Sequence, residues 1–598
     1  MIDKRVRGFT SLVVQRLEAF DKAYRTSPNR VKAEEEAKRS IAGYFSEHYK
    51  DAVYAEGRSS RHPCLPRMAT RSLVSDDTTH FMPHDQFFKL DGETLEDDQV
   101  KEPVVIELLH LLREGKFERF FRGVSLQAHL CGTCPVEVGW VEKYRTTTTP
   151  GAEGGDEEFK RDRELIYNGP KFRIYDFFSV FFDPCPPPDL EDHEVARHVH
   201  SYMTIEQLKR QARDEKTGVL KYEDIEKIKP KDDEDGGHDE NKQYHEEIGI
   251  QGTRVVGGQR VKTRHGDFEI TIDGEPYLFE NYVITWVNGE TLIRFEPNTR
   301  PGGRIPVQAI TCTPSGIPGR VEGQSSLGPA DGLSSAFTAI LNQDIDLRGK
   351  MIKGTGTVLE NSPAFVDGVT LDGGLVPVSS HDDVRPYPSD VRLLEIVNIL
   401  GLYKGLYFKA TGAPQMHSVD EQPRTAFEHS RLAATQSALT TERIKHYSEQ
   451  FTPLFYDLLE LRAEFGDEMV SRPPLETGTA KPKKLFGLIP MGQGQPEEPE
   501  WVDIPREVFK RKFRITLLGA GIVALKAELL AGYSRFFELY ANLPPQTQAR
   551  INIEHIIKSY WKAAVGRDDG DLFKTLTAED ELLSVAENAQ AQGAPNAQ

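Results

Sequence analysis

The chain has 598 residues, more than a single hydrophobic core usually organises, so its length predicts several domains. Hydrophobic residues make up 38% of it, enough for packed interiors, and a formal net charge of −19 excludes a chain that is basic throughout and clamps nucleic acid. Five scattered cysteines exclude the disulfide framework of a small secreted protein.

Signals for export or membrane insertion are weak in this sequence. The first twenty residues mix charged and apolar side chains and lack the apolar centre of a signal peptide. The longest uncharged apolar run lies near 515–525 and is shorter than the ~20 residues that span a bilayer. We therefore expect a soluble protein in a reducing, intracellular compartment, without a membrane partner.

The first part of the chain alternates helical and β patterns. Apolar residues at helical spacing predict one or two helices over 8–50 and a further helix over 104–130. Three β-rich segments follow at 135–144, 164–182 and 193–203. Thr204 and Gln207 then form a capping box, which predicts a short helix over 205–214.

Residues 253–311 have the pattern of an antiparallel sheet. Asp273-Gly274 and Asn288-Gly289 each separate two alternating apolar runs, which is the strongest short signal for a β-hairpin. The apolar residues expected to share faces are Phe268, Ile270 and Ile272 on one strand and Ile284 and Trp286 on the next. The combination of helices with this sheet predicts an α+β fold.

Two polar stretches interrupt these elements. Residues 146–158 are interpreted as a hairpin tip or loop, and residues 231–247 as a solvated acidic linker. The acidic linker lacks the ligand spacing of an EF-hand, so a calcium loop is not favoured there.

The pattern changes after residue 328. A helix with an apolar stripe is predicted from 329, and a second helix over 390–410. Between them, residues 355–388 read as short strands broken by Gly and Pro. The stretch 411–424 is a Gly/Pro loop that carries polar and charged residues.

A very long helix is predicted over 425–466, begun by a capping box of Thr425 and Glu428 and interrupted only at Pro453. A Pro-rich linker over 472–500 leads to a C-terminal unit that begins with a strand and continues as helices. The final residues are of low complexity and are expected to be disordered.

None of the candidate catalytic or binding motifs in the sequence is complete. Cys131-Gly-Thr-Cys134 follows a helix and precedes a strand, so two small residues in a turn are favoured over a redox or zinc motif. The run from Gly519 to Ala524 resembles a dinucleotide fingerprint, but the region about twenty residues later is helical and aromatic. A plain turn from strand to helix is the favoured interpretation there.

Other catalytic signatures are also missing from the sequence. It contains no Walker A phosphate loop, and the residues after Gly323 do not match a nucleophile elbow. His198 and His200 share one face of a predicted strand, where a polar face is favoured over a metal site. We therefore expect no enzyme activity, no cofactor and no metal.

The order of elements carries the remaining signal. The stretches concerned are NGPKFRIYDFFSVFFDP (168–184), GRVEGQSSLGPADGLSSAFTAILNQDID (319–346), the loop and long helix from 412 to 466, and FRITLLGAGIVALKAELLAGYSRFFELYANL (513–543). Together they resemble the portal, or head-to-tail connector, proteins of tailed bacteriophages, particularly the larger portals of short-tailed phages. The resemblance lies in pattern and order rather than in a strict motif.

The resemblance implies a portal-like fold with wing, helical stem, small β clip and helical crown that assembles as a dodecameric ring. The implied parts are an N-terminal wing (1–328), a first stem helix (329–354), a clip (355–389), a second stem helix (390–410), a tunnel loop (411–424), a long wing helix with linker (425–500), and a C-terminal wing and crown with a disordered tail (501–598).

Residues that face the DNA channel follow from the same resemblance. They are Gln415, Met416, His417, Asp420 and Glu421 of the tunnel loop, with Lys404 and Lys409 of the preceding helix. Acidic groups repel phosphates and keep contacts weak, while lysines supply transient attraction. The clip interface would be formed by Glu360, Asp367, Asp372, Asp382 and Asp383.

The partners implied are double-stranded DNA, the terminase large subunit, tail adaptor proteins, scaffold and the major capsid protein. The expected location is the portal vertex of the virion, reached after assembly in the host cytoplasm. Two alternatives stay open: another ring-forming head–tail component such as an adaptor, and a dinucleotide-dependent enzyme built on 519–524.

Overall fold

The fold combines helices with antiparallel sheets. The computed structural model describes residues 2–46, 61, 63–82, 87–150, 159–186, 194–212, 221–229, 258–272, 274–314, 320–352, 356–358, 384–386, 393–413, 426–472 and 502–517. Every pair of named strands among these residues is antiparallel, and the predicted α+β class is confirmed in that general form.

Two helices open the chain where one or two were predicted. Helix α1 (Thr10–Thr26) and helix α2 (Pro28–Phe45) are separated by Ser27, whose hydroxyl accepts a hydrogen bond from the Arg30 backbone N–H at 3.3 Å. Proline at the first position of α2 costs no hydrogen bond there, so the break is encoded locally.

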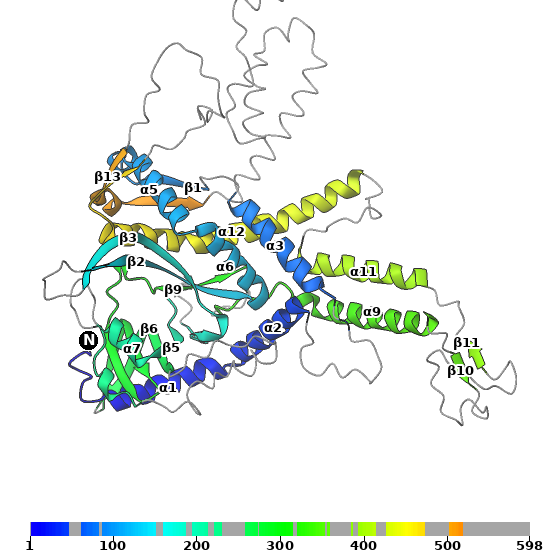
Figure 1. The fold of residues 1–598 in the computed structure, drawn as a ribbon, viewed down its shortest axis with the longest axis horizontal. Helices are drawn as coiled ribbons and strands as arrows, with labels where there is room; N and C mark the ends of the chain where they lie inside the picture. Colours follow the sequence, from blue (N-terminus) through cyan, green and yellow to red (C-terminus); the bar gives the residue numbers. More distant parts are fainter. Residues whose placement is uncertain are drawn as a thin grey trace, which may run out of the picture.

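A five-stranded sheet packs against α1 (Figure 1). Its order is β4 (Val180–Phe182), β5 (Arg197–Thr204), β6 (Gly258–Ile272), β7 (Glu275–Val287) and β8 (Thr291–Pro297). Phe268, Ile270, Ile272, Ile284 and Trp286 are all buried on it, as their alternation predicted. Helix α7 (Ile205–Gln211) follows β5 and begins with the predicted capping box.

Both predicted hairpins are present. Strands β6 and β7 pair directly across the first turn, in which Gly274 has φ +88°. The second turn joins β7 to β8, with φ +54° at Asn288 and +73° at Gly289. These backbone conformations are the ones that asparagine and glycine adopt most readily, so turn chemistry fixes the strand register.

A second layer forms the larger core. It contains α3 (Leu65–Phe81), α5 (Lys101–Glu114), α6 (Phe117–Cys131), α12 (Ala426–Phe465) and the sheet β3-β2-β9 (Phe159–Ile174, Thr133–Pro150 and Val307–Thr311). Phe81 and Phe121 stack there at 4.3 Å between ring centroids, with Phe451 of α12 packed against both.

Two helical predictions in this layer were wrong in detail. The single helix over 104–130 is two helices, because the chain turns at Gly115 and at Lys116, which has φ +55°. The long helix is not interrupted at Pro453 but runs continuously from Ala426 to Phe465. The apolar face of α12 is buried against the aromatic core on both sides of the proline, and this packing offsets the lost backbone hydrogen bond.

Short elements close the body. They are α4 (Leu95–Gln99), β1 (Phe88–Gly92), β12 (Met469–Arg472), β13 (Val502–Pro505), β14 (Phe513–Leu517) and 3₁₀ turns at Phe177–Ser179, Ile225–Lys227, Pro301–Gly303, Gly328–Ala330 and Arg506–Lys510. Strand β14, predicted from the sequence, pairs with β1 across more than four hundred residues. The acidic linker 231–247, the Pro-rich linker after Arg472 and residues 519–524 lie outside the described residues.

Candidate functional site

A pair of helices projects from the body. Helix α9 (Asp331–Ile352) and helix α11 (Leu393–Thr411) lie side by side, and the short ribbon of β10 (Gly356–Val358) and β11 (Val384–Pro386) lies at their far end (Figure 1). Since β10 follows α9 and β11 precedes α11, the chain runs out along one helix and back along the other. The predicted helix boundaries agree with these to within three residues.

The root of the pair is firmly packed. Tyr407 and Phe408 of α11 are buried together with Leu327 and Ala330, which precede α9. Helix α11 ends at Thr411, and the following Gly412 has a φ of +67°, the left-handed conformation that commonly terminates a helix. The Ala413 N–H donates to the Phe408 carbonyl at 3.1 Å, so the start of the predicted tunnel loop is held in a defined direction.

One face of α11 is apolar and uncovered. Ile399, Leu402 and Leu406 are 41%, 61% and 41% exposed, and their spacing of three and four residues places them in one stripe along the helix. We call these three residues the α11 stripe. Exposed apolar patches are frequent at contact surfaces, which makes the α11 stripe a candidate contact surface.

The predicted channel residues divide into two groups. Lys404 and Lys409 both lie on α11, where Lys404 is half-buried and Lys409 is exposed. The tunnel-loop residues Gln415, Met416, His417, Asp420 and Glu421 lie outside the described residues, as do the clip residues Glu360, Asp367, Asp372, Asp382 and Asp383. The structure gives the positions of the two lysines, and the channel and clip roles of all these residues stay predictions.

The histidine pair on β5 lies on one polar face, as was favoured from the sequence. That face is buried: His198 and His200 pack against α1, where both contact Asp21. We call this buried group the α1 cluster. Its members are Glu18, Asp21, His198, His200, Lys262 and Arg264.

Hydrogen-bond partners fix the charge of these histidines. His198 lies 3.2 Å from Asp21 through Nδ1 and 2.9 Å from Arg264 through Nε2. An arginine nitrogen only donates, so His198 Nε2 must accept and the ring is neutral. Burial first, and the nearby Arg264 charge after it, lower the pKa of His198 to about 4 against the opposing effect of Asp21.

A second buried group connects α12 to the body. We call it the α12 cluster. Its members are Asp76 and Asp77 of α3, Ser125 and His129 of α6, Ser326 before α9, and Arg443 of α12. Arg443 donates to Asp77 at 2.5 Å and to Asp76 at 2.9 Å, so the long helix is tied to α3 by one guanidinium.

The α12 cluster contains a serine–histidine–aspartate chain of hydrogen bonds. His129 Nδ1 lies 2.8 Å from Ser326 Oγ, and its Nε2 lies 2.8 Å from Asp77 Oδ2. A catalytic histidine must be neutral to take the serine proton. Burial opposes the charged form of His129, but the charge of Asp77, together with the neighbouring Cys312, outweighs it and raises the pKa to about 9.

The arrangement therefore acts as an ion-pair cluster rather than as a nucleophile. A protonated His129 is no general base, its ring is fully buried, and Asp77 is already paired with Arg443. The cluster balances two carboxylates with two cations and joins the segment before α9 to α3, α6 and α12.

The cysteine motif carries no reactive thiol. Cys131 ends α6 and Cys134 opens β2, both are buried, and burial raises the pKa of both thiols. The expected turn is therefore correct in position, and a thiolate is disfavoured there. Within the described part of the chain, no group of His, Cys, Asp or Glu is arranged to hold a metal ion.

Sequence reasoning missed the carboxylates that meet the histidines. Asp21 precedes His198 by 177 residues, and Asp77 precedes His129 by 52. No local spacing signals such contacts. The one available hint was an acidic residue on the otherwise apolar face of a predicted helix, as Asp21 is beside Leu17.

Comparison with known proteins does not assign a family. Neither a protein-family model nor a curated protein matches the chain. Among the helices of the described residues, none combines the length and the apolar character that crossing a bilayer demands.

Proposed function

We propose that the chain is a portal protein, which forms a dodecameric ring at one capsid vertex and provides the channel for DNA packaging and ejection. In this proposal α9 and α11 are the stem helices, the β10–β11 ribbon belongs to the clip, and α12 is the long wing helix. The ring has no enzyme activity of its own, and a separate ATP-driven terminase moves the DNA.

The observation that carries the proposal is the uncovered α11 stripe on a projecting helical pair. In an isolated chain, Ile399, Leu402 and Leu406 stay partly exposed to water. Full burial of an aliphatic side chain stabilises by about 1.5–3 kcal/mol relative to full exposure, so an isolated chain forgoes part of this free energy at each of the three positions. A ring buries one such stripe per subunit against its neighbour. Closed symmetry is the usual way in which identical chains cover identical apolar faces.

The arrangement of elements favours a portal over an adaptor or another head–tail ring. A stem pair with a small β tip and a long helix that returns into the body matches the order of parts implied by the resemblance. In the proposed ring, the clip would meet the terminase large subunit and later tail adaptors, and the wing would meet scaffold and the major capsid protein. The site of action would be the virion, after assembly in the host cytoplasm.

Particle mass measured together with negative-stain images tests the ring. We expect a closed ring with a central hole and a mass near twelve times 67.4 kDa. Leu402→Asp should prevent ring formation because it places a charge in each apolar contact. The matched control is Leu278→Asp, a leucine that is 58% exposed on β7 and far from the stripe in sequence.

Full ring formation by Leu402→Asp would contradict the assignment of the stripe. A compact dimer that binds NAD or FAD would contradict the portal proposal itself and favour the enzyme alternative based on 519–524.

The channel loop has its own test. Deleting residues 413–422 should leave ring assembly intact and impair DNA packaging or retention, because the loop is proposed to narrow the channel. Packaging of full-length DNA is measured by nuclease protection in assembled particles. Normal packaging and retention by the deletion variant would show that the loop has no channel role.

A further inference from the structure

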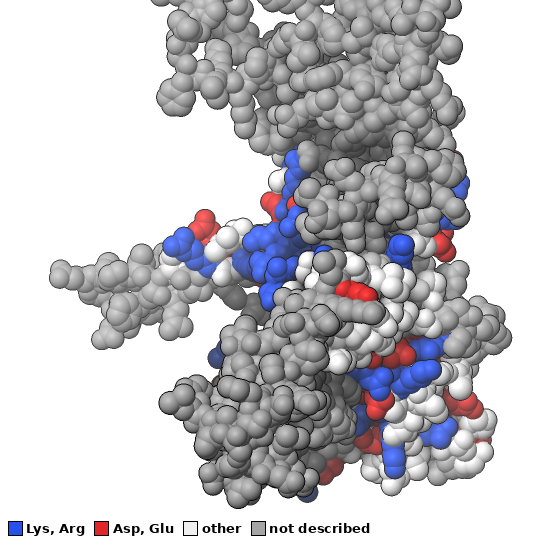
Figure 2. Space-filling view, turned by 90° about the vertical axis from the view of Figure 1, so that its right-hand side faces the viewer, with Lys and Arg blue, Asp and Glu red and all other residues white. Residues whose placement is uncertain are grey.

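Basic side chains gather locally in this acidic protein. The chain carries a net charge of −19, yet the face drawn in Figure 2 shows a compact group of Lys and Arg side chains. An uneven distribution of this kind marks a surface that attracts anionic groups. A pocket between α3, the end of α5 and the start of α6 combines such cations with an apolar floor.

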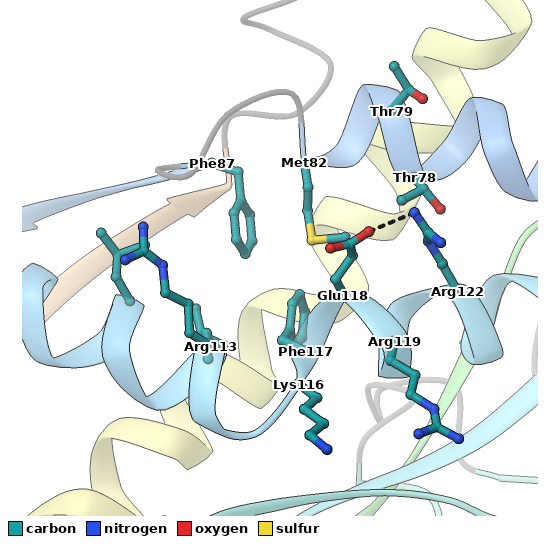
Figure 3. Close-up of a pocket in the computed structure, with 12 residues that line it drawn as sticks. Thr78, Thr79, Met82, Phe87, Arg113, Lys116, Phe117, Glu118, Arg119 and Arg122 are labelled. Atoms are coloured by element: carbon teal, nitrogen blue, oxygen red, sulfur yellow. Dashed lines mark ion pairs between the residues drawn. The ribbon is translucent and has the colours of Figure 1, made fainter. Parts of the chain in front are cut away.

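The pocket is large enough for side chains of a peptide. Its volume is about 750 Å³, and an adjoining hollow of about 390 Å³ shares Thr78, Thr79 and Arg122 with it and adds Arg71. Figure 3 shows Met82, Phe87 and Phe117 converging at its centre. Because the two hollows share Thr78, Thr79 and Arg122, one ligand of several residues can contact both.

Cations border the apolar centre. Arg113 lies on one side in Figure 3, Arg122 on the other, and Lys116 and Arg119 along the lower edge. Among the described lining residues, Glu118 is the one carboxylate, and it pairs with Arg122 at 2.6 Å. These described residues carry a formal net charge of +3, from four cations and one carboxylate.

The position of the rim is set by the turn between α5 and α6. Lys116 caps α6 with φ +55°, so the chain reverses sharply and brings Arg113 and Arg119 to the same opening. The first backbone N–H groups of α6 add a partial positive charge at this end of the helix. The side chains and the helix direction thus favour the same kind of ligand, an anion.

We propose that this pocket binds the acidic segment 568–587 of the chain itself. That segment, DDGDLFKTLTAEDELLSVAE, has seven carboxylates and one lysine, a formal net charge of −6. It also carries Leu572, Phe573 and Leu576, which supply apolar side chains for the floor. Opposite charge at the rim and apolar contact at the centre are the two features that such an interface combines.

The end of the described chain supports this occupant. Leu517, the last described residue, pairs with Phe88 of β1, and Phe88 directly follows Phe87 of the pocket floor. The last described residue of the chain therefore lies beside the pocket. Fifty residues separate Leu517 from 568, and this length permits a return to the pocket. A tethered segment has a high effective concentration at a nearby site.

A peptide fits the pocket better than DNA does. Phosphate backbones would meet the cations but offer nothing to Met82, Phe87 and Phe117. A segment that alternates carboxylates with leucine and phenylalanine uses both parts of the site. The inference does not depend on ring formation.

Photocrosslinking in the full-length chain tests the proposal. A benzoylphenylalanine replaces Met82, a half-buried residue of the floor, and mass spectrometry identifies the crosslinked partner. We expect crosslinks to 568–587. A synthetic 568–587 peptide in excess should lower their yield, and a peptide of scrambled sequence should do so less.

Charge reversal provides the matched comparison. Lys116→Glu with Arg119→Glu should lower the crosslink yield about tenfold, because two attractive charges become repulsive. Lys22→Glu, an exposed lysine on α1, should leave the yield unchanged. Crosslinks to other segments, crosslinks to added duplex DNA, or an equal yield in the reversed variant would each overturn the proposal.

Discussion

The α1 cluster and the α12 cluster both bury histidine beside aspartate, yet their histidines carry different charges. In the α1 cluster, Arg264 donates to the far nitrogen of His198, which forces a neutral ring. In the α12 cluster, the far nitrogen of His129 meets the Ser326 hydroxyl, which can accept, and the ring is protonated.

The difference shows that a histidine's second partner decides its charge. Asp21 already has Lys262 at 2.9 Å, so its negative charge is balanced before either histidine titrates. Asp77 and Asp76 together have Arg443, and His129 supplies the second cation. Each cluster is close to electrically balanced, but by different residues, and this predicts opposite responses to mutation and to pH.

Removing the aspartate should affect the α12 cluster most. Asp77→Asn leaves Arg443 and His129 buried with one carboxylate in place of two, and the free energy of unfolding should fall by about 3–5 kcal/mol. Asp21→Asn should cost less, about 1–3 kcal/mol, because Lys262 keeps Glu18 at 2.7 Å. Urea unfolding of both variants at neutral pH measures the difference. A larger loss for Asp21→Asn would reverse the comparison.

Part of the fold could be predicted from the sequence, and part of it could not. The hairpin at Asn288-Gly289, the capping box at Thr204, the apolar stripe of α9 and the long helical pattern of α12 are local signals, and the corresponding elements are present. Helix α3 and strand β1 were not predicted, although α3 supplies Asp77 and β1 pairs with β14.

The contacts within the two buried clusters could not be predicted from the sequence for a different reason. Arg443 meets Asp77 across 366 residues, and a contact of that separation depends on how whole layers pack. Pro453 misled the prediction for α12 because the cost of a helical proline is local, whereas the burial that offsets it is tertiary.

Raising the pH should weaken the α12 cluster. The pKa of His129 is raised to about 9 from 6.5, so its contribution to stability is complete below pH 6.5 and is lost as the pH rises towards 9. The expected loss is on the order of 1–3 kcal/mol. His129→Gln should remove this pH dependence from denaturant unfolding curves between pH 6.5 and 9. An unchanged slope in that variant would mean that another group titrates there.

Lowering the pH should weaken the α1 cluster. The pKa of His198 is lowered to about 4, so the unfolded chain binds more protons between pH 6.5 and 4 and stability falls as the pH falls through that window. The expected effect is on the order of 1–3 kcal/mol, as for His129, because the two pKa shifts are of similar size. Unfolding curves of His198→Gln, which has no proton to gain, provide the control. Stability that rises on acidification would contradict a neutral His198.

Replacing the arginine donor tests the cause of the difference directly. Arg264→Gln removes the charge that faces His198 and places an amide there, whose oxygen can accept a hydrogen bond. The pKa of His198 should then rise by about one unit, because Asp21 remains as a partner for a protonated ring. The NMR titration of the imidazole C–H signals measures this shift with little dependence on stability. Arg260→Gln, which faces His200 at the longer distance of 3.4 Å, should produce a smaller shift at that ring. If neither pKa moves, burial alone keeps His198 and His200 neutral. The second hydrogen-bond partner of the ring would then not explain the difference between the two clusters.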